Sequence, residues 1–267
     1  KKSKHKIQGI DNDYDYAEWY DLTKPTEEEL AAQRTAVFEY MPKLSVVIPA
    51  YKTPERYLKE MLNSILAQTY ENWEICIADG SPAGESCERV LKRYAEQDRR
   101  FKYVILGENK GISGNTNAAM DMAAGDFIVL ADHDDTLPPH ALYEVVKAIN
   151  EHPEADVIYS DEDKMDMDGG ALFDPHFKPD FNIDLLRSVN YICHLFVVSH
   201  DLAARTGGFR QEFDGAQDYD FIFRCVESAG QVYHIPKVLY HWRCHQNSTA
   251  SNPESKLYAF EAGSRAI

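Results

Sequence analysis

The sequence predicts an α/β fold, with a Rossmann-like, mostly parallel central sheet and helices on both faces. Short apolar runs without polar alternation, such as residues 44–51 and 127–131, are typical of buried parallel strands. Between such runs, apolar residues recur at helical spacing, as at Leu58, Met61 and Leu62. Strands that alternate with helices at this pitch indicate right-handed βαβ units.

Residues 1–43 are predicted to form a helical extension that precedes the main domain. Tyr16, Trp19 and Tyr20 lie in an aromatic segment that is expected to form a short helix. Residues 26–29, Thr-Glu-Glu-Glu, then provide the cap residue and the first-turn acids of a second helix. We expect this extension to pack outside the core or against another module.

Residues 44–267 are predicted to form one α/β domain. Its strands are expected at residues 44–51, 74–79, 101–106, 127–131 and 157–160. Helices are expected over the apolar stripe from Leu58 to Leu66, around Val90 to Ala95, from residue 111 to about 124, and from Pro138 onward. The chain starts and stops abruptly, as expected of a piece of a longer, multi-domain protein.

Composition excludes one class of partner. The chain has 267 residues, 44% of them hydrophobic and 27% charged, with a formal net charge of -16. Binding of nucleic acid depends on basic patches that neutralise phosphates, so we expect no nucleic-acid partner. An acidic protein that binds an anionic ligand needs a metal ion or a few well-placed Arg and Lys side chains.

The chain is expected to be cytoplasmic. Its five cysteines include no CxxC pair and are interpreted as free thiols in a reducing compartment. No apolar run approaches the roughly 20 residues that cross a bilayer. The basic start at residues 1–4 is not followed by the apolar segment of a signal peptide. Peripheral association with the inner face of a membrane stays open.

An acidic cluster follows directly on the predicted strand 127–131. Asp132, Asp134 and Asp135 are expected at the carboxyl end of that strand, where parallel sheets bind ligands. Carboxylates so close together raise one another's pKa unless a cation lies between them. Oxygen ligands favour Mg²⁺ or Mn²⁺ over zinc. The alternative is a cap for the helix at Pro138, but one Asp would be enough for a cap.

Two nucleotide-binding classes are disfavoured. A dinucleotide-binding fold would have GxGxxG in the first strand-to-helix turn, but residues 49–54 contain no glycine. Gly111 and Gly114 come too late in the chain for this role, and no Walker A sequence is present. A sugar nucleotidyltransferase would need a glycine-rich, basic first loop, which is also absent.

A series of short motifs resembles family 2 glycosyltransferases, which are inverting enzymes with the GT-A fold. The motifs are Val-Val-Ile-Pro-Ala-Tyr at 46–51, Ser-Ile-Leu-Ala-Gln-Thr-Tyr at 64–70, Ala-Asp-Gly-Ser at 78–81, Asn-Lys-Gly at 109–111, Ala-Asp-His-Asp-Asp at 131–135, Gly-Gly-Phe at 207–209, Gln-Asp-Tyr-Asp at 217–220 and Leu-Tyr-His-Trp-Arg at 239–243. The resemblance covers about residues 44–250. Residues 159–164 and 177–180 resemble the bacterial branch that builds O-antigen, rhamnan and capsule polysaccharides.

The resemblance implies a nucleotide-sugar site. Asp79 would accept the N3–H of uracil or thymine, although an Asp before a glycine is also a common turn former. Asp132 would lie near the ribose. In many relatives an Arg stands where this chain has Thr116. The other residues implied to contact or shape the nucleotide-sugar site are Pro49, Ala50, Tyr51, Asn109, Gly111, Asn117, Arg243 and His245.

The resemblance also implies a metal site. Asp134, the second acid of the family's DxD element, would hold Mn²⁺ or Mg²⁺, and His241 would complete the coordination. A lone histidine at a strand end is, however, more often a packed or hydrogen-bonded core residue. Asn247, Ser248 and Thr249 would lie on a loop that closes over the donor.

Asp218 matches the family's catalytic base. Inverting transfer needs a carboxylate that takes the proton of the acceptor hydroxyl as its oxygen attacks the anomeric carbon. Asp218 could instead cap the helix that follows. Asp161, Glu162, Asp163 and Gln217 are implied to form the floor of a sugar or acceptor pocket. The alternative for the run from 161 to 163 is a solvated turn.

The resemblance thus implies an inverting, metal-dependent glycosyltransferase with Asp218 as general base. Its donor would be a UDP- or dTDP-linked sugar, and its acceptor a hydroxyl of a growing bacterial surface glycan or lipid-linked glycan. Other transferase domains of the same pathway are expected partners. A catalytically silent donor-binding or scaffold domain is the alternative, and intact Asp134 and Asp218 speak against it.

Overall fold

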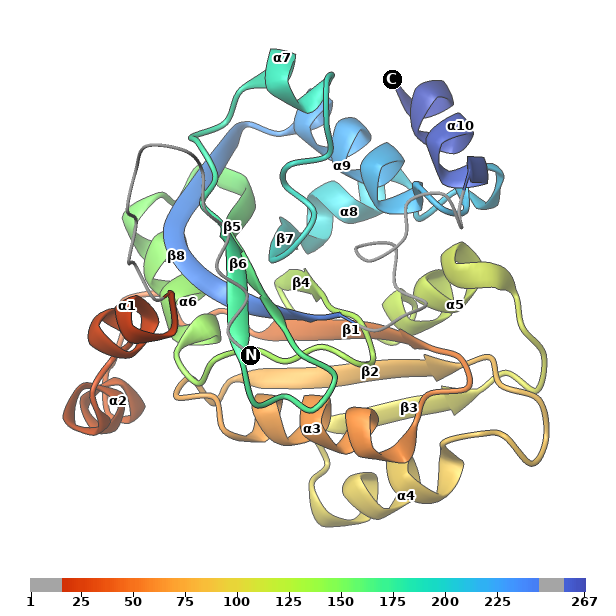
Figure 1. Ribbon diagram of the computed structural model, residues 1–267, viewed down its shortest axis with the longest axis horizontal. Coiled ribbons are helices and arrows are strands. Elements are labelled where there is room, and N and C mark those ends of the chain that lie inside the picture. The colour runs from red at the N-terminus through yellow and green to blue at the C-terminus, as the bar shows by residue number, and fades with distance from the viewer. Residues whose placement is uncertain (1–15, 245–256) are drawn as a thin grey trace, which may run out of the picture.

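The computed structural model describes residues 16–244 and 257–267, which fold around one eight-stranded sheet (Figure 1). The strand order is β3-β2-β1-β4-β7-β5-β6, and β8 pairs with β5 outside this path. The strands are β1 (Leu44–Ala50), β2 (Trp73–Asp79), β3 (Phe101–Ile105), β4 (Phe127–Leu130), β5 (Ala155–Met165), β6 (Leu172–His176), β7 (Phe196–Ser199) and β8 (Gln231–Arg243).

Helices cover both faces of the sheet, as predicted. They are α1 (Tyr16–Thr23), α2 (Glu27–Arg34), α3 (Glu55–Leu66), α4 (Glu88–Gln97), α5 (Gly111–Met120), α6 (Ala141–Glu151), α7 (Ile183–Leu186), α8 (His200–Thr206), α9 (Gln217–Ser228) and α10 (Leu257–Ala266), with a 3₁₀ turn η1 (Gln211–Phe213). Helices α3, α4 and α6 contribute to one apolar cluster and α5, α8 and α9 to another. Among the described residues, no helix is both long enough and apolar enough to span a membrane.

The first half of the sheet confirms the predicted βαβ arrangement. β1 lies between β2 and β4, and all three run parallel. Every residue of β1 and β2 is buried, which explains why their sequences show no polar alternation. α3 follows β1 and presents Leu58, Met61, Leu62 and Ile65 to the core, the stripe seen in the sequence.

The second half of the sheet is mixed. β7 runs antiparallel to β4, so Phe196 at the start of β7 pairs with Leu130 at the end of β4. The segment before β7 therefore lies at the same edge as the acidic residues after β4. Sequence periodicity does not report strand direction, and this neighbourhood was not predicted.

Residues 161–163 form part of β5 and not a solvated turn, so that alternative is wrong. All three acids are buried inside a strand of eleven residues, Ala155–Met165. Each has partners from distant parts of the chain. Asp161 accepts from His234 and Glu162 pairs with Lys178. Buried carboxylates are tolerated in a strand only when such partners satisfy them.

The N-terminal helices pack on the β5–β8 half of the molecule, whereas α10 lies next to α9 at the other side (Figure 1). α2 begins with the predicted capping box between Thr26 and Glu29. From α1, the Tyr16 hydroxyl donates to Asp163 at 2.7 Å. The Trp19 ring packs edge-on against Phe177. The contacts of α1 are therefore polar and aromatic, at the surface of β5 and β6.

Candidate active site

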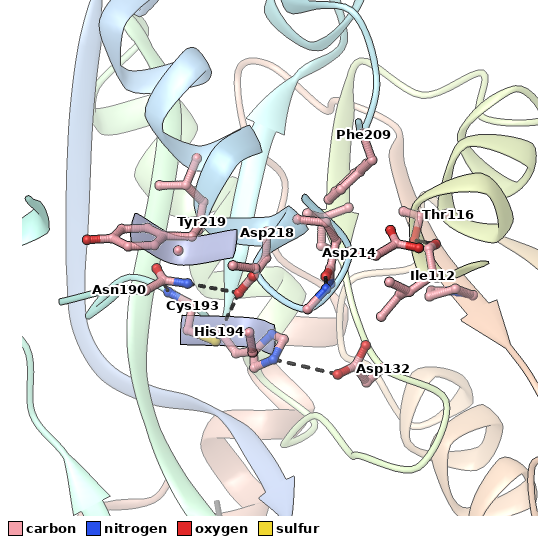
Figure 2. Close-up of a pocket in the computed structure, with 18 of the residues that line it drawn as sticks. Ile112, Thr116, Asp132, Asn190, Cys193, His194, Phe209, Asp214, Asp218 and Tyr219 are labelled. Atoms are coloured by element: carbon pink, nitrogen blue, oxygen red, sulfur yellow. Dashed lines mark hydrogen bonds and ion pairs between the residues drawn. The ribbon is translucent and has the colours of Figure 1, made fainter. Parts of the chain in front are cut away.

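A cavity of about 840 Å³ lies at the edge of the sheet where β1 and β4 end. Pro49, at the end of β1, and Asp132, just after β4, line it on the sheet side. In Figure 2, Ile112 and Thr116 lie at one end, Asn190 and Tyr219 at the other, and Asp132, His194 and Asp218 between them. α10 supplies a further wall through Gly263 and Ser264. This is the edge at which parallel α/β sheets bind ligands.

The acidic loop after β4 is held in place by the end of β8. The Tyr240 hydroxyl donates to Asp135 at 2.5 Å and accepts from the Asp132 amide at 3.0 Å. The Arg243 amide donates to the second carboxylate oxygen of Asp135 at 2.7 Å. Thr136 and His241 exchange two backbone hydrogen bonds. Each oxygen of Asp135 thus accepts one hydrogen bond and keeps a further lone pair, and the direction of the loop is set by β8.

The carboxylates of this loop repel one another, and a bound cation would relieve that repulsion. Removal from water, together with the charges of Asp134 and Asp218, raises the pKa of Asp132, and His194 partly opposes this. Burial, with the charges of Asp134 and Asp132, raises the pKa of Asp135 well above its ordinary value. Like charges this close favour either protonation or a bound cation.

The donor set suits a divalent metal. One ligand atom each from Asp132, Asp135 and His194 lies within 4.8 Å of the others. The buried Nδ1 of His194 has no hydrogen-bond partner among the described residues, although its ring stacks on Tyr240 at 4.5 Å. Two carboxylates and one imidazole fit Mn²⁺ well and Mg²⁺ through the oxygens.

Among the described residues, the predicted metal ligand His241 contacts Asp163 and Tyr20, and the contacts of Asp134 include Arg243 and His133. Nδ1 of His241 donates to Asp163 at 2.6 Å, and the Tyr20 hydroxyl lies 3.3 Å from Nε2. His241 therefore has the environment of a packed core histidine, the alternative weighed from the sequence. Asp134 accepts a hydrogen bond from Arg243 through its backbone carbonyl, and its carboxylate lies 3.8 Å from His133.

Asp218 lines the cavity from the first turn of α9. The N-cap position of this helix is Ala216, and no side chain caps it, so capping does not account for Asp218. One oxygen of its carboxylate accepts hydrogen bonds from the side-chain amide of Asn190 at 2.8 Å and from the Cys193 thiol at 3.6 Å. Burial and the negative charge of Asp218 raise the pKa of Cys193 well above its ordinary value, so this thiol keeps its proton and donates.

The residues implied to bind the base have mixed positions. Pro49 lines the cavity, Ala50 is buried, and the Tyr51 ring is 40% exposed. Asp79 is fully buried and forms the predicted turn. It accepts from the Ser81 and Cys87 amides at 2.9 and 2.7 Å and from a serine hydroxyl. Both of its carboxylate oxygens thus have partners within the protein.

Asn109, Gly111 and Asn117 shape the loop and helix beside the cavity. Asn109 accepts from the Gly111 amide at 3.0 Å. Gly111 has a φ of +75° and lies so close to Asp214 that a Cβ would collide with it. The Asn117 side chain exchanges two hydrogen bonds with the Phe209 backbone, at 2.7 and 2.8 Å. These contacts attach α5 to the segment that leads to α9.

Arg243 is buried and holds protein groups together. Its guanidinium donates to Glu60 at 2.6 Å, to the Met167 carbonyl at 3.0 Å and to the Asp134 carbonyl at 2.6 Å. It lies 4.6 Å from the centre of the Tyr57 ring. His245, which was implied to contact the nucleotide sugar, lies outside the described residues. So does the expected closing loop of Asn247, Ser248 and Thr249.

Of the residues implied for the acceptor pocket, two line cavities. Gln217 lines the main cavity and accepts from the Gly215 amide at 2.9 Å. Glu162 lines a second, smaller cavity. Asp161 and Asp163 line neither, since Asp161 bonds His234 and the Lys178 amide, and Asp163 bonds His241.

Three residues at the site were missed from the sequence. Asn190, Cys193 and His194 precede β7, and because β7 is antiparallel they lie beside Asp132 and Asp218. The available signal was two polar side chains, Asn190 and His194, just before the apolar strand 196–199. Its use would have required the direction of that strand.

The mixed sheet, the acidic loop at its edge and a facing carboxylate define a glycosyltransferase domain of the GT-A type. Residues 45–198 match the family model Glycosyl transferase family 2. The chain belongs to this family.

Named relatives are longer than this chain. It is 47% identical over 228 residues to the uncharacterized protein y4gI of Sinorhizobium fredii, covering 85% of this chain and 25% of that protein. It is 35% identical over 253 residues to the O-antigen biosynthesis protein RfbC of Myxococcus xanthus, covering 95% of this chain and 20% of that protein. The chain thus spans a quarter or less of the length of these relatives.

Solved structures share the fold. TarS residues 1–349 of S. aureus, in complex with UDP, align with a TM-score of 0.65 and 21% identity, covering 84% of this chain and 65% of that one. The mannosyltransferase PcManGT of Pyrobaculum calidifontis, in complex with GDP-Man and Mn²⁺, aligns with a TM-score of 0.59 and 19% identity, covering 83% and 64%.

Proposed function

We propose that this domain is an inverting, metal-assisted glycosyltransferase. It moves a sugar from a UDP- or dTDP-linked donor to a hydroxyl of a growing bacterial surface glycan. The observation that carries this proposal is the position of Asp218, whose carboxylate lines the same cavity as the acidic residue Asp132. One cavity then holds both groups that the reaction requires, one for the leaving diphosphate and one for the acceptor proton.

Asp132, Asp135 and His194 would hold the cation. A bound Mn²⁺ or Mg²⁺ would neutralise charge on the departing diphosphate and orient it. The residues of β8 keep this loop in position through Tyr240 and the Arg243 amide. The proposal thus replaces the pair Asp134 and His241 by a set that the cluster geometry supports. The Mn²⁺ in the PcManGT complex is a precedent within the fold.

Asp218 would accept the proton of the acceptor hydroxyl. The Asn190 amide and the Cys193 thiol occupy one of its carboxylate oxygens. The other oxygen would accept the proton of the incoming hydroxyl, and two donors on the first oxygen would restrict rotation of the carboxylate. A base within hydrogen-bond reach of the attacking oxygen is the geometric requirement for this step.

The choice of donor and pathway is supported by comparison. TarS was solved with UDP, and RfbC of Myxococcus xanthus is named for O-antigen biosynthesis. A pyrimidine nucleotide agrees with the implied role of Asp79. In this conformation, however, the carboxylate oxygens of Asp79 accept hydrogen bonds from backbone amides of the turn. Other transferase domains on the same polypeptide are part of the proposal, since the matched relatives are several times longer.

The experiment is a donor screen with a matched variant. The domain is incubated with UDP-, dTDP- and GDP-linked sugars and Mn²⁺, and nucleotide release and melting temperature are followed. We expect nucleotide release with UDP- or dTDP-sugars. These donors should also stabilise the folded domain by a free energy of RT ln(1 + [L]/Kd). Asp218→Asn should abolish transfer while UDP still stabilises the fold. Transfer that persists in Asp218→Asn would remove Asp218 as the base. Binding without turnover in the wild type would favour a donor-binding scaffold.

A further inference from the structure

A second cavity, of about 420 Å³, adjoins the main one. It lies between β5, β6 and the end of β8 and is lined by Glu162, Lys164, Asp174, Pro175, His176, Asn190, Cys193 and Trp242. Asn190, Cys193 and Trp242 line both cavities. Because Asn190 and Cys193 are also the partners of Asp218, the boundary between the two cavities lies at the proposed base.

The order of groups along the two cavities matches the direction of an inverting displacement. Asp132 lies on one side of Asp218, and Asn190 on the other (Figure 2). In such a displacement the nucleophile and the leaving group occupy opposite sides of the reacting carbon. A diphosphate near Asp132 therefore requires an acceptor that arrives from the side of Asn190. The second cavity begins there.

The wall of this cavity is rigid. Glu162 pairs with Lys178, whose side chain is fully buried. The ammonium of Lys178 also donates to the carbonyls of Ile192 and His194. One carboxylate oxygen of Glu162 accepts from the Lys178 ammonium and from the His194 backbone amide, both at 3.2 Å, and the other lies 3.5 Å from Nδ1 of His176. The Glu162 carboxylate is thus held in a fixed position.

The lining has the chemistry of a carbohydrate site. Trp242 offers a flat apolar ring of the kind that packs against the C–H face of a pyranose, with polar groups around it. Glu162 and Asp174 accept hydrogen bonds, and His176 adds a second type of polar group.

The charges at this cavity favour a neutral sugar. Lys164 forms an ion pair with Asp174, and Lys178 forms one with Glu162. The lysines on the described part of this wall are therefore already paired. A uronic acid would meet two carboxylates without a spare lysine, which costs affinity.

We propose that the second cavity is the acceptor subsite and takes a neutral pyranose of the growing glycan. The ring would pack on Trp242, with hydroxyls on Glu162, Asp174 and His176, and would present its reacting hydroxyl past Asn190 to Asp218. This assignment rests on the proposed transferase function and adds the location and charge class of the acceptor.

The test uses transfer to defined acceptors. The probes are methyl glycosides of rhamnose, glucose, galactose and mannose, with methyl glucuronide as the acidic counterpart. His176→Ala and Asp174→Asn alter residues that line the second cavity and not the main one. We expect each variant to raise the KM for the best neutral acceptor about 5- to 10-fold, because each removes one hydrogen bond to the acceptor. The Kd for UDP, measured by calorimetry, should stay within about twofold. His176→Trp, which fills the cavity, should stop transfer to acceptor while donor hydrolysis continues.

The control is Lys147→Ala, which removes an exposed ion pair with Glu151 on α6 and should change none of these values. An unchanged acceptor KM in the two cavity variants would overturn the assignment. So would a preference for the glucuronide, or donor hydrolysis without transfer to any neutral probe. Absence of both donor hydrolysis and UDP binding would instead overturn the proposed function itself.

Discussion

Lys178 is the residue whose replacement tests the structure most directly. Its side chain is fully buried and joins Glu162 to the carbonyls of Ile192 and His194. Lys178→Met keeps most of the side-chain volume but leaves Glu162 without its counter-charge. Loss of one partner of a buried ion pair costs about 3–5 kcal/mol. At about 2–4 °C per kcal/mol for a domain of this size, the melting temperature should fall by roughly 6–20 °C.

The pH dependence gives this prediction a specific signature. In the wild type the pKa of Glu162 is lowered to about 2 from its ordinary 4.5. Its contribution to stability is therefore present above pH 4.5 and is lost as the pH falls toward 2. Without Lys178, burial raises the pKa of Glu162, so the sign reverses. The variant then loses stability as the pH rises, and its deficit relative to wild type should be larger at pH 8 than at pH 5.

Urea unfolding at several pH values, followed by circular dichroism, measures both effects. Lys147→Met is the control, because Lys147 is exposed and should contribute about 0–1 kcal/mol. The double variant Glu162→Gln, Lys178→Met should recover part of the loss, since no buried charge remains. A Lys178→Met variant within about 1 kcal/mol of wild type, with no dependence on pH, would refute the contacts assigned to Lys178.

Three further substitutions test the site. Asn190→Ala removes a hydrogen-bond donor to Asp218. In steady-state kinetics it should lower kcat about 10-fold with little change in the KM for the donor sugar. A change in that KM without a change in kcat would contradict the role of Asn190. His194→Ala should weaken Mn²⁺ binding, measured by electron paramagnetic resonance in the presence of UDP. The control is His152→Ala, which changes a residue just after α6 that stacks on Tyr233 and should leave the affinity unchanged. Equal Mn²⁺ affinities of the two variants would exclude His194 as a ligand. Asn117→Ala removes two hydrogen bonds to the Phe209 backbone. The free energy of unfolding, measured with urea, should fall by about 1–3 kcal/mol. An unchanged urea midpoint would count against that contact.

The acidic loop shows how far strand-end reasoning extends. Placement of Asp132 and Asp135 at the sheet edge required only a buried apolar strand and the rule that parallel sheets bind ligands there. The metal partner required more. The family resemblance implied His241 as the partner, but its ring nitrogens contact Asp163 and Tyr20. Tyr20 comes from α1, more than two hundred residues earlier, and no local pattern connects the two.

The run from Asp161 to Asp163 shows the opposite limit. In isolation, successive acids indicate a solvated turn, because buried unpaired charges are costly. In the fold, Lys178, His234 and His241 satisfy these acids one by one. Lys178 follows β6 and both histidines lie on β8, all distant in sequence from these acids. The burial of the acids therefore depends on contacts that exist only after the chain has folded.

By itself, the sequence determined the α/β class, the parallel arrangement of the first strands, the amphipathic helices and the acidic edge, because these follow from hydrophobic periodicity and from the residues that end each buried run. Its motifs also identified the family. The tertiary structure alone decided that β7 runs antiparallel beside β4, which brings Asn190 and His194 to Asp218 and Asp132. The physical reason is that strand direction and long-range pairing depend on how elements pack together, whereas periodicity reports only which face of each element is buried.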